Sequence, residues 1–166
     1  MHKNKLISVA LVLCTVAISF TGCSVGQGSI KPDSPSDGKY STQYANSAVE
    51  YYMYLAKQTS VFTNQLTTHM MLIANSSDAD NYELQIKSAQ QSIDTMQDTL
   101  DEVEVTAPSV NAEDDRENII LAMQLAIEHM TGYKEALEKG EDVSGFKTDF
   151  QNDFNAITAL ANNYYE

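Results

Sequence analysis

Two histidine–methionine clusters contain the side chains best suited to metal chemistry in this sequence. His69, Met70 and Met71 lie in one amphipathic segment, and His129 and Met130 lie in another. Imidazole nitrogen and thioether sulfur are ligands that suit copper or a haem iron. If both segments are helices of one bundle, His69 and His129 are expected at similar heights, with an axial offset of about 6 Å. A copper or haem site is therefore one hypothesis.

A structural interpretation of the same residues stays open. Methionine on the apolar face of a helix often fills irregular gaps in a core, and a single histidine there is often hydrogen-bonded to its neighbours. His129 also falls beside the apolar row of its segment rather than on it. The two segments are expected to lie diagonally across the bundle, which weighs against a ligand shared between them.

Missing motifs exclude several classes of enzyme and cofactor site. A ferritin-type di-iron centre needs Glu-x-x-His on two helices, but Leu66 and Ala126 stand three residues before the two histidines. The sequence has no Cys-x-x-Cys-His, no two histidines four apart, no Gly-x-Ser-x-Gly and no phosphate-binding glycine loop. We therefore expect no enzyme activity.

Eight carboxylates flank the connection between the second and third amphipathic segments. They are Asp98, Asp101, Glu102, Glu104, Glu113, Asp114, Asp115 and Glu117, with Arg116 as the basic residue among them. Calcium takes six to eight oxygen ligands, so a calcium site is one interpretation. The alternating acids and central glycine of an ordered calcium loop are missing, and this favours a solvated acidic end of the bundle.

Tyrosines gather near the start of the first segment and the end of the last. Tyr51 and Tyr54 are expected to point away from the apolar row, whereas Tyr52 and Tyr164 fit the rows of their segments. Tyrosine is favoured where one edge of the ring is buried and the other is wet. A patch of Tyr51 and Tyr54 for a protein partner, a glycan or the membrane interface is therefore one hypothesis.

Four helices are expected to position these side chains. Apolar residues recur at alternating steps of four and three, which is typical of helix faces packed on other helices. The expected helices span about 41–75, 79–105, 112–139 and 143–165. The apolar row of the first is Ala48, Tyr52, Leu55, Thr59, Phe62, Leu66, His69 and Ile73. Short connections favour antiparallel neighbours, hence an all-α, up-down-up-down four-helix bundle.

Local signals mark the ends of these helices. Pro108 is expected to end the second helix, because proline disfavours helical geometry in the residue before it. Asn111 is predicted to cap the third helix and Gly140 to stop it. Gly132, inside the third helix, costs about 1 kcal/mol relative to alanine, and a close approach of two helices would explain it.

The first 23 residues have the organisation of an export signal. Lys3 and Lys5 form a basic head, an apolar run of about 15 residues follows, and Thr21-Gly22-Cys23 comes next. The run is shorter than the roughly 20 apolar residues of a membrane-spanning helix. Thr21-Gly22-Cys23 resembles the end of the lipobox of bacterial lipoprotein precursors, although Phe20 stands where that family usually has leucine. The resemblance implies that the thiol of Cys23 is diacylated and that the chain is cut just before it.

Ordinary signal cleavage, after Ala17-Ile18-Ser19, is the alternative and would give a soluble secreted protein. Cleavage before Cys23 instead gives a signal peptide over 1–22, a lipidated cysteine and flexible tether over 23–40, and a helical domain over 41–166. A tether rich in glycine, serine and proline behaves as a flexible coil.

Charge limits the partners of the mature chain. Loss of Lys3 and Lys5 leaves 8 basic against 23 acidic side chains, a formal charge of −15. Nucleic acid is excluded as a partner, because its binding rests on basic side chains that neutralise phosphates. Attraction to anionic lipid is excluded on the same ground. Two acyl chains on Cys23 are therefore expected to hold the protein, since two chains give a stable anchor where one does not.

Together these observations predict an extracytoplasmic lipoprotein, anchored to a bacterial cell membrane, that acts as a non-catalytic binding or accessory module. It is expected to be a monomer without a cofactor, and its partner would be an envelope protein or a glycan. The alternative function is a copper- or haem-binding bundle that uses His69, Met70, His129 and Met130.

Overall fold

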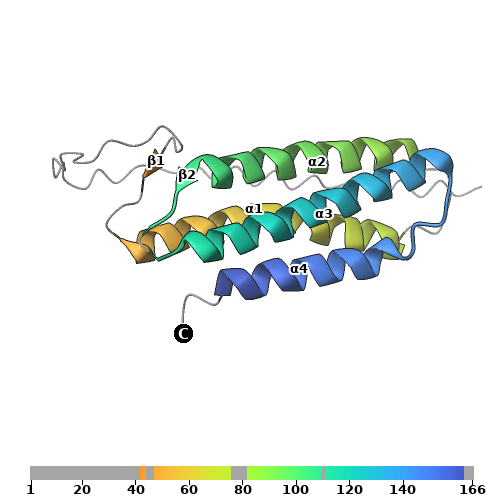
Figure 1. Ribbon diagram of the computed structural model, residues 1–166. Helices are drawn as coiled ribbons and strands as arrows, with labels where there is room; N and C mark the ends of the chain where they lie inside the picture. Colours follow the sequence, from red (N-terminus) through yellow and green to blue (C-terminus); the bar gives the residue numbers. More distant parts are fainter. Residues whose placement is uncertain (1–41, 44–46, 76–81, 110, 163–166) are drawn as a thin grey trace, which may run out of the picture. The chain divides into compact units, whose positions relative to one another are not determined.

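The computed structural model describes residues 42–43, 47–75, 82–109 and 111–162 (Figure 1). All of them belong to one compact unit, Pro35–Glu166. The predicted signal peptide, Cys23 and most of the predicted tether domain lie outside that unit, and all of them lie outside the described residues. No helix in the described ranges is long and apolar enough to cross a membrane.

Four helices make up nearly all of the described chain, which confirms the all-α fold class and the four-helix bundle. They are α1 (Ala48–Asn75), α2 (Tyr82–Val105), α3 (Glu113–Lys139) and α4 (Phe146–Asn162). Two short strands, β1 (Thr42–Gln43) and β2 (Thr106–Ala107), pair in parallel.

The helices pack as a ring in which each one packs most extensively on two neighbours. α1 packs on α2 and α4, and α3 packs on the same two helices, so α1 and α3 are diagonal, as expected. The start of α1 lies against the end of α2, where the Tyr54 hydroxyl donates to the Glu102 carbonyl oxygen. Figure 1 shows α2 and α3 joined at the end where α1 begins, and α3 and α4 joined at the opposite end. This arrangement is consistent with helices of alternating direction.

The core row of α3 is the one predicted from the sequence. Its six predicted members are all buried: Ile119, Met123, Ala126, Met130, Tyr133 and Leu137. The predicted stop is also confirmed, because Gly140 adopts a left-handed φ of 67°. The Gly140 amide donates to the Leu137 carbonyl oxygen and the Glu141 amide to that of Ala136, which is the Schellman arrangement.

The predicted cap of α3 is wrong. Asn111 has a positive φ of 70°, and the residue that precedes the helix is Ala112, which makes no side-chain cap hydrogen bond. An N-cap residue needs an extended backbone, so that its side chain can turn back to the first amides. The three acids of the first turn, Glu113, Asp114 and Asp115, instead place negative charge at the positive end of the helix dipole.

Two expectations for the first helix are also wrong. It begins at Ala48 rather than near 41, because Thr42 and Gln43 form β1 and pair with β2. The core row begins at Tyr51 rather than Tyr52: Tyr51 is fully buried, while Tyr52 is half-buried and Ala48 is exposed. Tyr52 lies three residues before Leu55 and Tyr51 lies four before it, and both spacings return to the same helix face. Spacing alone therefore does not choose between the two tyrosines. Tyr52 lies at the edge because its hydroxyl donates to Asp115 of α3, at 3.2 Å.

The interior of the bundle is more polar than the apolar rows suggested. On α2, three polar side chains spaced seven apart are buried, Gln85, Ser92 and Thr99. On α4, Asp153 is buried between Phe150 and Ile157. A buried polar group costs free energy unless it is hydrogen-bonded, so the partners of these side chains determine how the helices are aligned.

Candidate functional site

An open groove with a volume of about 280 Å³ runs between α1 and α4. Its walls include Thr59, Ser60, Thr63 and Asn64 of α1 and Phe154 and Thr158 of α4. These positions recur at steps of three and four, so each set occupies one face of its helix. The remaining lining residues, Ala56, Ala161 and Asn162, are also small or uncharged. The groove is therefore a neutral surface on a chain whose net charge is −13.

Two buried hydroxyls in the floor of the groove are already used as donors. Thr59 Oγ1 donates to the Leu55 carbonyl oxygen at 2.9 Å, and Thr63 Oγ1 donates to the Thr59 carbonyl oxygen at 2.8 Å. A hydroxyl has two acceptor lone pairs besides its proton. The floor can consequently accept hydrogen bonds from a ligand, while the amide of Asn64 can both donate and accept.

His69 lies at the centre of the bundle and is fully buried. Its Nε2 is 3.0 Å from Ser92 Oγ of α2, and Ser92 Oγ donates to Gln65 Oε1 at 3.0 Å. Because the Ser92 hydroxyl uses its proton in the bond to Gln65, it can only accept from His69. The imidazole therefore carries its proton on Nε2. The other ring nitrogen, Nδ1, is buried without a hydrogen-bond partner. Burial lowers the pKa of His69 to about 4, and the backbone of Ser88 opposes this shift only in part.

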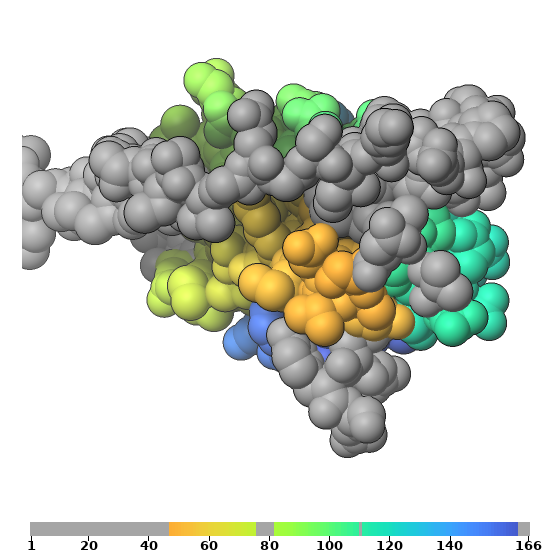
Figure 2. Space-filling view, turned by 90° about the vertical axis from the view of Figure 1, so that its left-hand side faces the viewer, coloured from red at the N-terminus to blue at the C-terminus, as the bar shows by residue number. Residues whose placement is uncertain are grey.

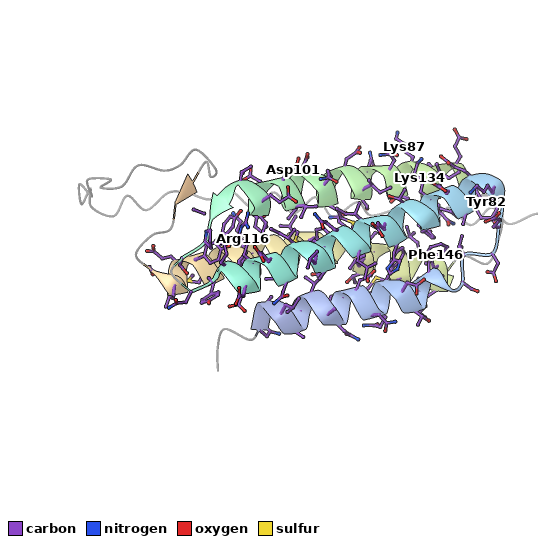
Figure 3. All side chains as sticks on the ribbon, viewed as in Figure 1. Tyr82, Lys87, Asp101, Arg116, Lys134 and Phe146 are labelled. Atoms are coloured by element: carbon purple, nitrogen blue, oxygen red, sulfur yellow. The ribbon has the colours of Figure 1, made fainter. Side chains whose placement is uncertain are left out.

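Aromatic rings surround His69 on the side of α3 and α4. Its ring centroid lies 5.3 Å from that of Tyr133 and 6.4 Å from that of Phe150, both with edge-to-face geometry. Phe146, labelled in Figure 3 at the start of α4, packs on both of these rings. Burial raises the pKa of Tyr133 to about 12, and its hydroxyl donates to Gln85 at 3.4 Å. The histidine thus occupies an uncharged environment.

His129 pairs with a different helix from His69. Its Nδ1 lies 2.8 Å from Asp153 Oδ2 of α4; Asp153 is buried, whereas a third of the His129 side chain is exposed. Burial raises the pKa of Asp153, and the contact with His129 opposes the shift. A carboxylate that accepts from Nδ1 fixes the orientation of the imidazole ring. Asp153 therefore acts as a positioning partner for His129.

The four residues of the predicted copper or haem site do not converge through any hydrogen bond or ring contact in the described chain. His69 engages α2 through Ser92, and His129 engages α4 through Asp153. Met130 is fully buried in the core row, and Met70 is half-buried. Over the described ranges, no group of three or more His, Cys, Asp or Glu side chains is arranged to hold a metal ion.

The predicted tyrosine patch is wrong in the structure. Tyr51 is fully buried in the core, so it offers no surface to a partner. Tyr54 is half-buried, and its hydroxyl lies 2.8 Å from the Glu102 carbonyl oxygen and 3.0 Å from Thr106 Oγ1. Both rings pack against each other, with centroids 6.1 Å apart. Tyr54 thus joins α1 to the end of α2, and Tyr51 packs against it in the core.

The acidic end of the bundle is organised around a buried arginine. Figure 2 views the end where α1 (orange) and α3 (teal) begin, and Figure 3 labels Arg116 there. Arg116 is only 5% exposed, and its guanidinium donates to the carbonyl oxygens of Val103 and Glu104 in the last turn of α2. Two of the eight carboxylates are half-buried: Glu113 lies 3.8 Å from the Arg116 guanidinium, and Asp115 accepts from the Tyr52 hydroxyl. The other six carboxylate side chains are exposed.

Sequence reasoning missed the buried polar residues Ser92, Gln85 and Asp153. Their spacing was the available signal: Gln85, Ser92 and Thr99 repeat every seven residues, and Asp153 continues the steps from Phe146 and Phe150 to Ile157. Apolar residues next to these positions, such as Ile86, Ile93 and Phe154, also fit the helical spacing, so spacing alone does not show that the polar residues are buried. No protein-family model, curated protein or solved structure matches the chain, so the candidate site rests on its own geometry.

Proposed function

We propose that this chain is a lipid-anchored, non-catalytic binding module of a bacterial cell envelope. The anchor is inferred from Thr21-Gly22-Cys23 directly behind an apolar run. Mass spectrometry of the mature protein tests it. The expected product begins at Cys23 and carries the mass of a diacylglyceryl group on sulfur. An unmodified thiol at Cys23, or a product that begins elsewhere, would contradict the anchor.

The groove between α1 and α4 is the observation that supports a binding role. It is uncharged on a chain of net charge −13, and it combines hydroxyl and amide groups with the aromatic ring of Phe154. Binding sites for small molecules have volumes from about 300 Å³ upward and use a few placed polar groups for orientation. A neutral ligand rich in hydroxyl groups, such as a short segment of an envelope glycan, fits this chemistry.

Filling the groove tests this role. Asn64 is exposed in the groove wall, and Asn64→Leu removes the amide and adds apolar bulk where the ligand would lie. Asn118→Leu on α3 is the matched control, because Asn118 is exposed and does not line the groove. Isothermal titration calorimetry with soluble oligosaccharides of N-acetylated hexosamines should show at least about a tenfold weaker Kd for the first variant, or about 1.4 kcal/mol. The control should bind like the parent protein.

Two outcomes would overturn the binding role of the groove. One is that both asparagine variants bind as tightly as the parent protein. The other is that the parent protein binds none of the oligosaccharides. Neither result would bear on the lipid anchor, which has its own test.

A further inference from the structure

We propose that His69 makes the bundle acid-sensitive: a proton added to Nδ1 separates α1 from α2 around the bond between His69 and Ser92. This inference goes beyond the proposed binding function. It rests on the position of both ring nitrogens in the core and does not require a ligand.

The hydrogen-bond chain across α1 and α2 uses Nε2–H of His69 as its donor, which leaves Nδ1 as the only ring position that can take up a proton. His69 Nε2 donates to Ser92 Oγ, and Ser92 Oγ donates to Gln65 Oε1. Nδ1 is buried without a partner. A proton there would create a cationic donor with no acceptor in the core, and a buried, unpaired charge costs several kcal/mol. The protein can relieve this cost by opening the core and hydrating the ring.

The groups that contact the ring from the three other helices carry no charge to compensate the added proton. They are Ser92 and the backbone of Ser88 of α2, Tyr133 of α3 and Phe150 of α4. Tyr133 stays neutral, because burial raises its pKa to about 12. The charged pair His129 and Asp153 lies one turn away on α3 and α4, and these two side chains bond each other.

The helix pair that would separate is also the least extensively packed one. α1 and α2 share a smaller interface than α2 and α3, α3 and α4, or α1 and α4. The bond between His69 and Ser92, continued to Gln65, is the polar connection between α1 and α2 in the interior of the described bundle. Opening the core to hydrate the charged ring would break this bond, and it would do so at the smallest of the four interfaces between neighbouring helices.

The sign of the pH effect follows from linkage. The pKa of His69 is about 4 in the folded chain against 6.5 for an ordinary histidine, so the unfolded chain binds the proton more tightly. The contribution of the neutral His69 ring to the free energy of unfolding is complete above pH 6.5. It is lost as the pH falls toward 4. Between pH 7.5 and 5.0, the equilibrium constant for unfolding should rise roughly 10- to 30-fold through this group alone.

The test is urea unfolding of the full-length chain at pH 7.5 and 5.0, with two variants. His69→Gln keeps a donor for Ser92 but cannot be protonated, so its change between the two pH values should be reduced to about threefold or less. His129→Gln removes the half-exposed histidine and should retain the full change. An equal change in the parent protein and in His69→Gln would overturn the proposal.

A second measurement covers the case in which His69→Gln does not fold. NMR titration of the imidazole carbons in the parent protein reports protonation of His69 directly. In the folded state the ring should remain neutral down to about pH 5, and the appearance of the protonated ring should coincide with loss of the ring-current shifts from Tyr133 and Phe150. A midpoint near 6.5 with the fold intact would overturn the proposal.

Discussion

Arg116 of α3 donates a hydrogen bond from Nη2 to the main-chain oxygen of Glu104 in the last turn of α2, at 2.5 Å. Its Nε donates to the neighbouring oxygen of Val103 at 3.3 Å. The last carbonyl groups of a helix have no partner within the helix, and a cation at this end also interacts favourably with the helix dipole. One side chain thus completes α2 and joins it to α3.

Two substitutions of Arg116 should separate the effect of its hydrogen bonds from the effect of its charge. Arg116→Met keeps much of the buried volume but leaves both carbonyl oxygens without the donor, and we expect a loss of about 3 kcal/mol in the free energy of unfolding. Arg116→Lys keeps a charge near the helix end but cannot form two planar hydrogen bonds, so a loss of about 1–2 kcal/mol is expected. Urea denaturation at pH 7 measures both. Equal losses would show that the paired geometry of the guanidinium does not matter.

Gly132 inside α3 and Gly140 directly after it should respond to alanine in opposite directions. At Gly132 an added Cβ would lie 3.4 Å from Cε1 of Phe146, at the far end of a side chain that can adjust. Gly132→Ala should therefore gain about 0.5–1 kcal/mol from helix propensity. At Gly140 the positive φ of 67° makes alanine unfavourable although nothing lies within 4 Å, and a loss of about 1 kcal/mol is expected. Thermal unfolding compares the two, and changes of the same sign would contradict this account.

Asp153 supplies a test of a buried carboxyl and its partner. Asp153→Asn keeps an acceptor for His129 Nδ1 and should change stability at pH 7 by less than about 1 kcal/mol, whereas Asp153→Ala leaves that donor unpaired and should cost about 1–3 kcal/mol. Because burial raises the pKa of Asp153, this carboxyl favours the folded state only below its ordinary pKa, and that contribution is lost as the pH rises through the raised value. The Asn variant should lack this loss.

Stability measured against pH, from 3 to 6, checks the second part of the Asp153 prediction. If Asp153→Asn and Asp153→Ala prove equally destabilising at pH 7, the hydrogen bond to His129 is not the important contact. The charge on Asp153 would then be the property that matters.

Truncation of two neighbouring α1 residues tests the register of the core row. Tyr51 is fully buried, and Tyr51→Ala should cost about 3–5 kcal/mol, as for other large aromatic side chains in cores. Met53 is 63% exposed, and Met53→Ala should change stability by no more than about 0.5 kcal/mol. Guanidinium unfolding of both variants gives the comparison. A large cost at Met53 with a small cost at Tyr51 would place the row on a different face.

The parts of the fold that could be predicted are those in which the spacing of apolar residues along a single helix is enough to identify its buried face. The row of α3 from Ile119 to Leu137 keeps steps of three and four throughout, so periodicity alone identifies it. At the start of α1 the same rule fails, because Tyr51 and Tyr52 are both aromatic and both lie one turn before Leu55. The contact between Tyr52 and Asp115 decides between them, and that partner is distant in sequence.

The candidate site depends on pairs of elements, which is why the sequence did not reveal it. The groove exists because small residues of α1 and α4 face each other, and neither stripe is distinctive alone. Asp153 is buried because His129 lies opposite it, 2.8 Å away. His69 was singled out for its ligand chemistry, but Ser92 and Gln65 give it a different environment, one that favours a neutral ring. Spacing within one helix does not show which side chains of other helices it will contact.

The parallel pairing of β1 with β2 determines how a force on the chain would be distributed. Thr42 and Gln43 lie opposite Thr106 and Ala107, in the connection between α2 and α3. Tension drawn from upstream of Thr42 therefore reaches the junction of α2 and α3 through the strand pair, and reaches α1 through the chain. A pull at Thr42 would therefore be shared by α1, α2 and α3 rather than carried by α1 alone.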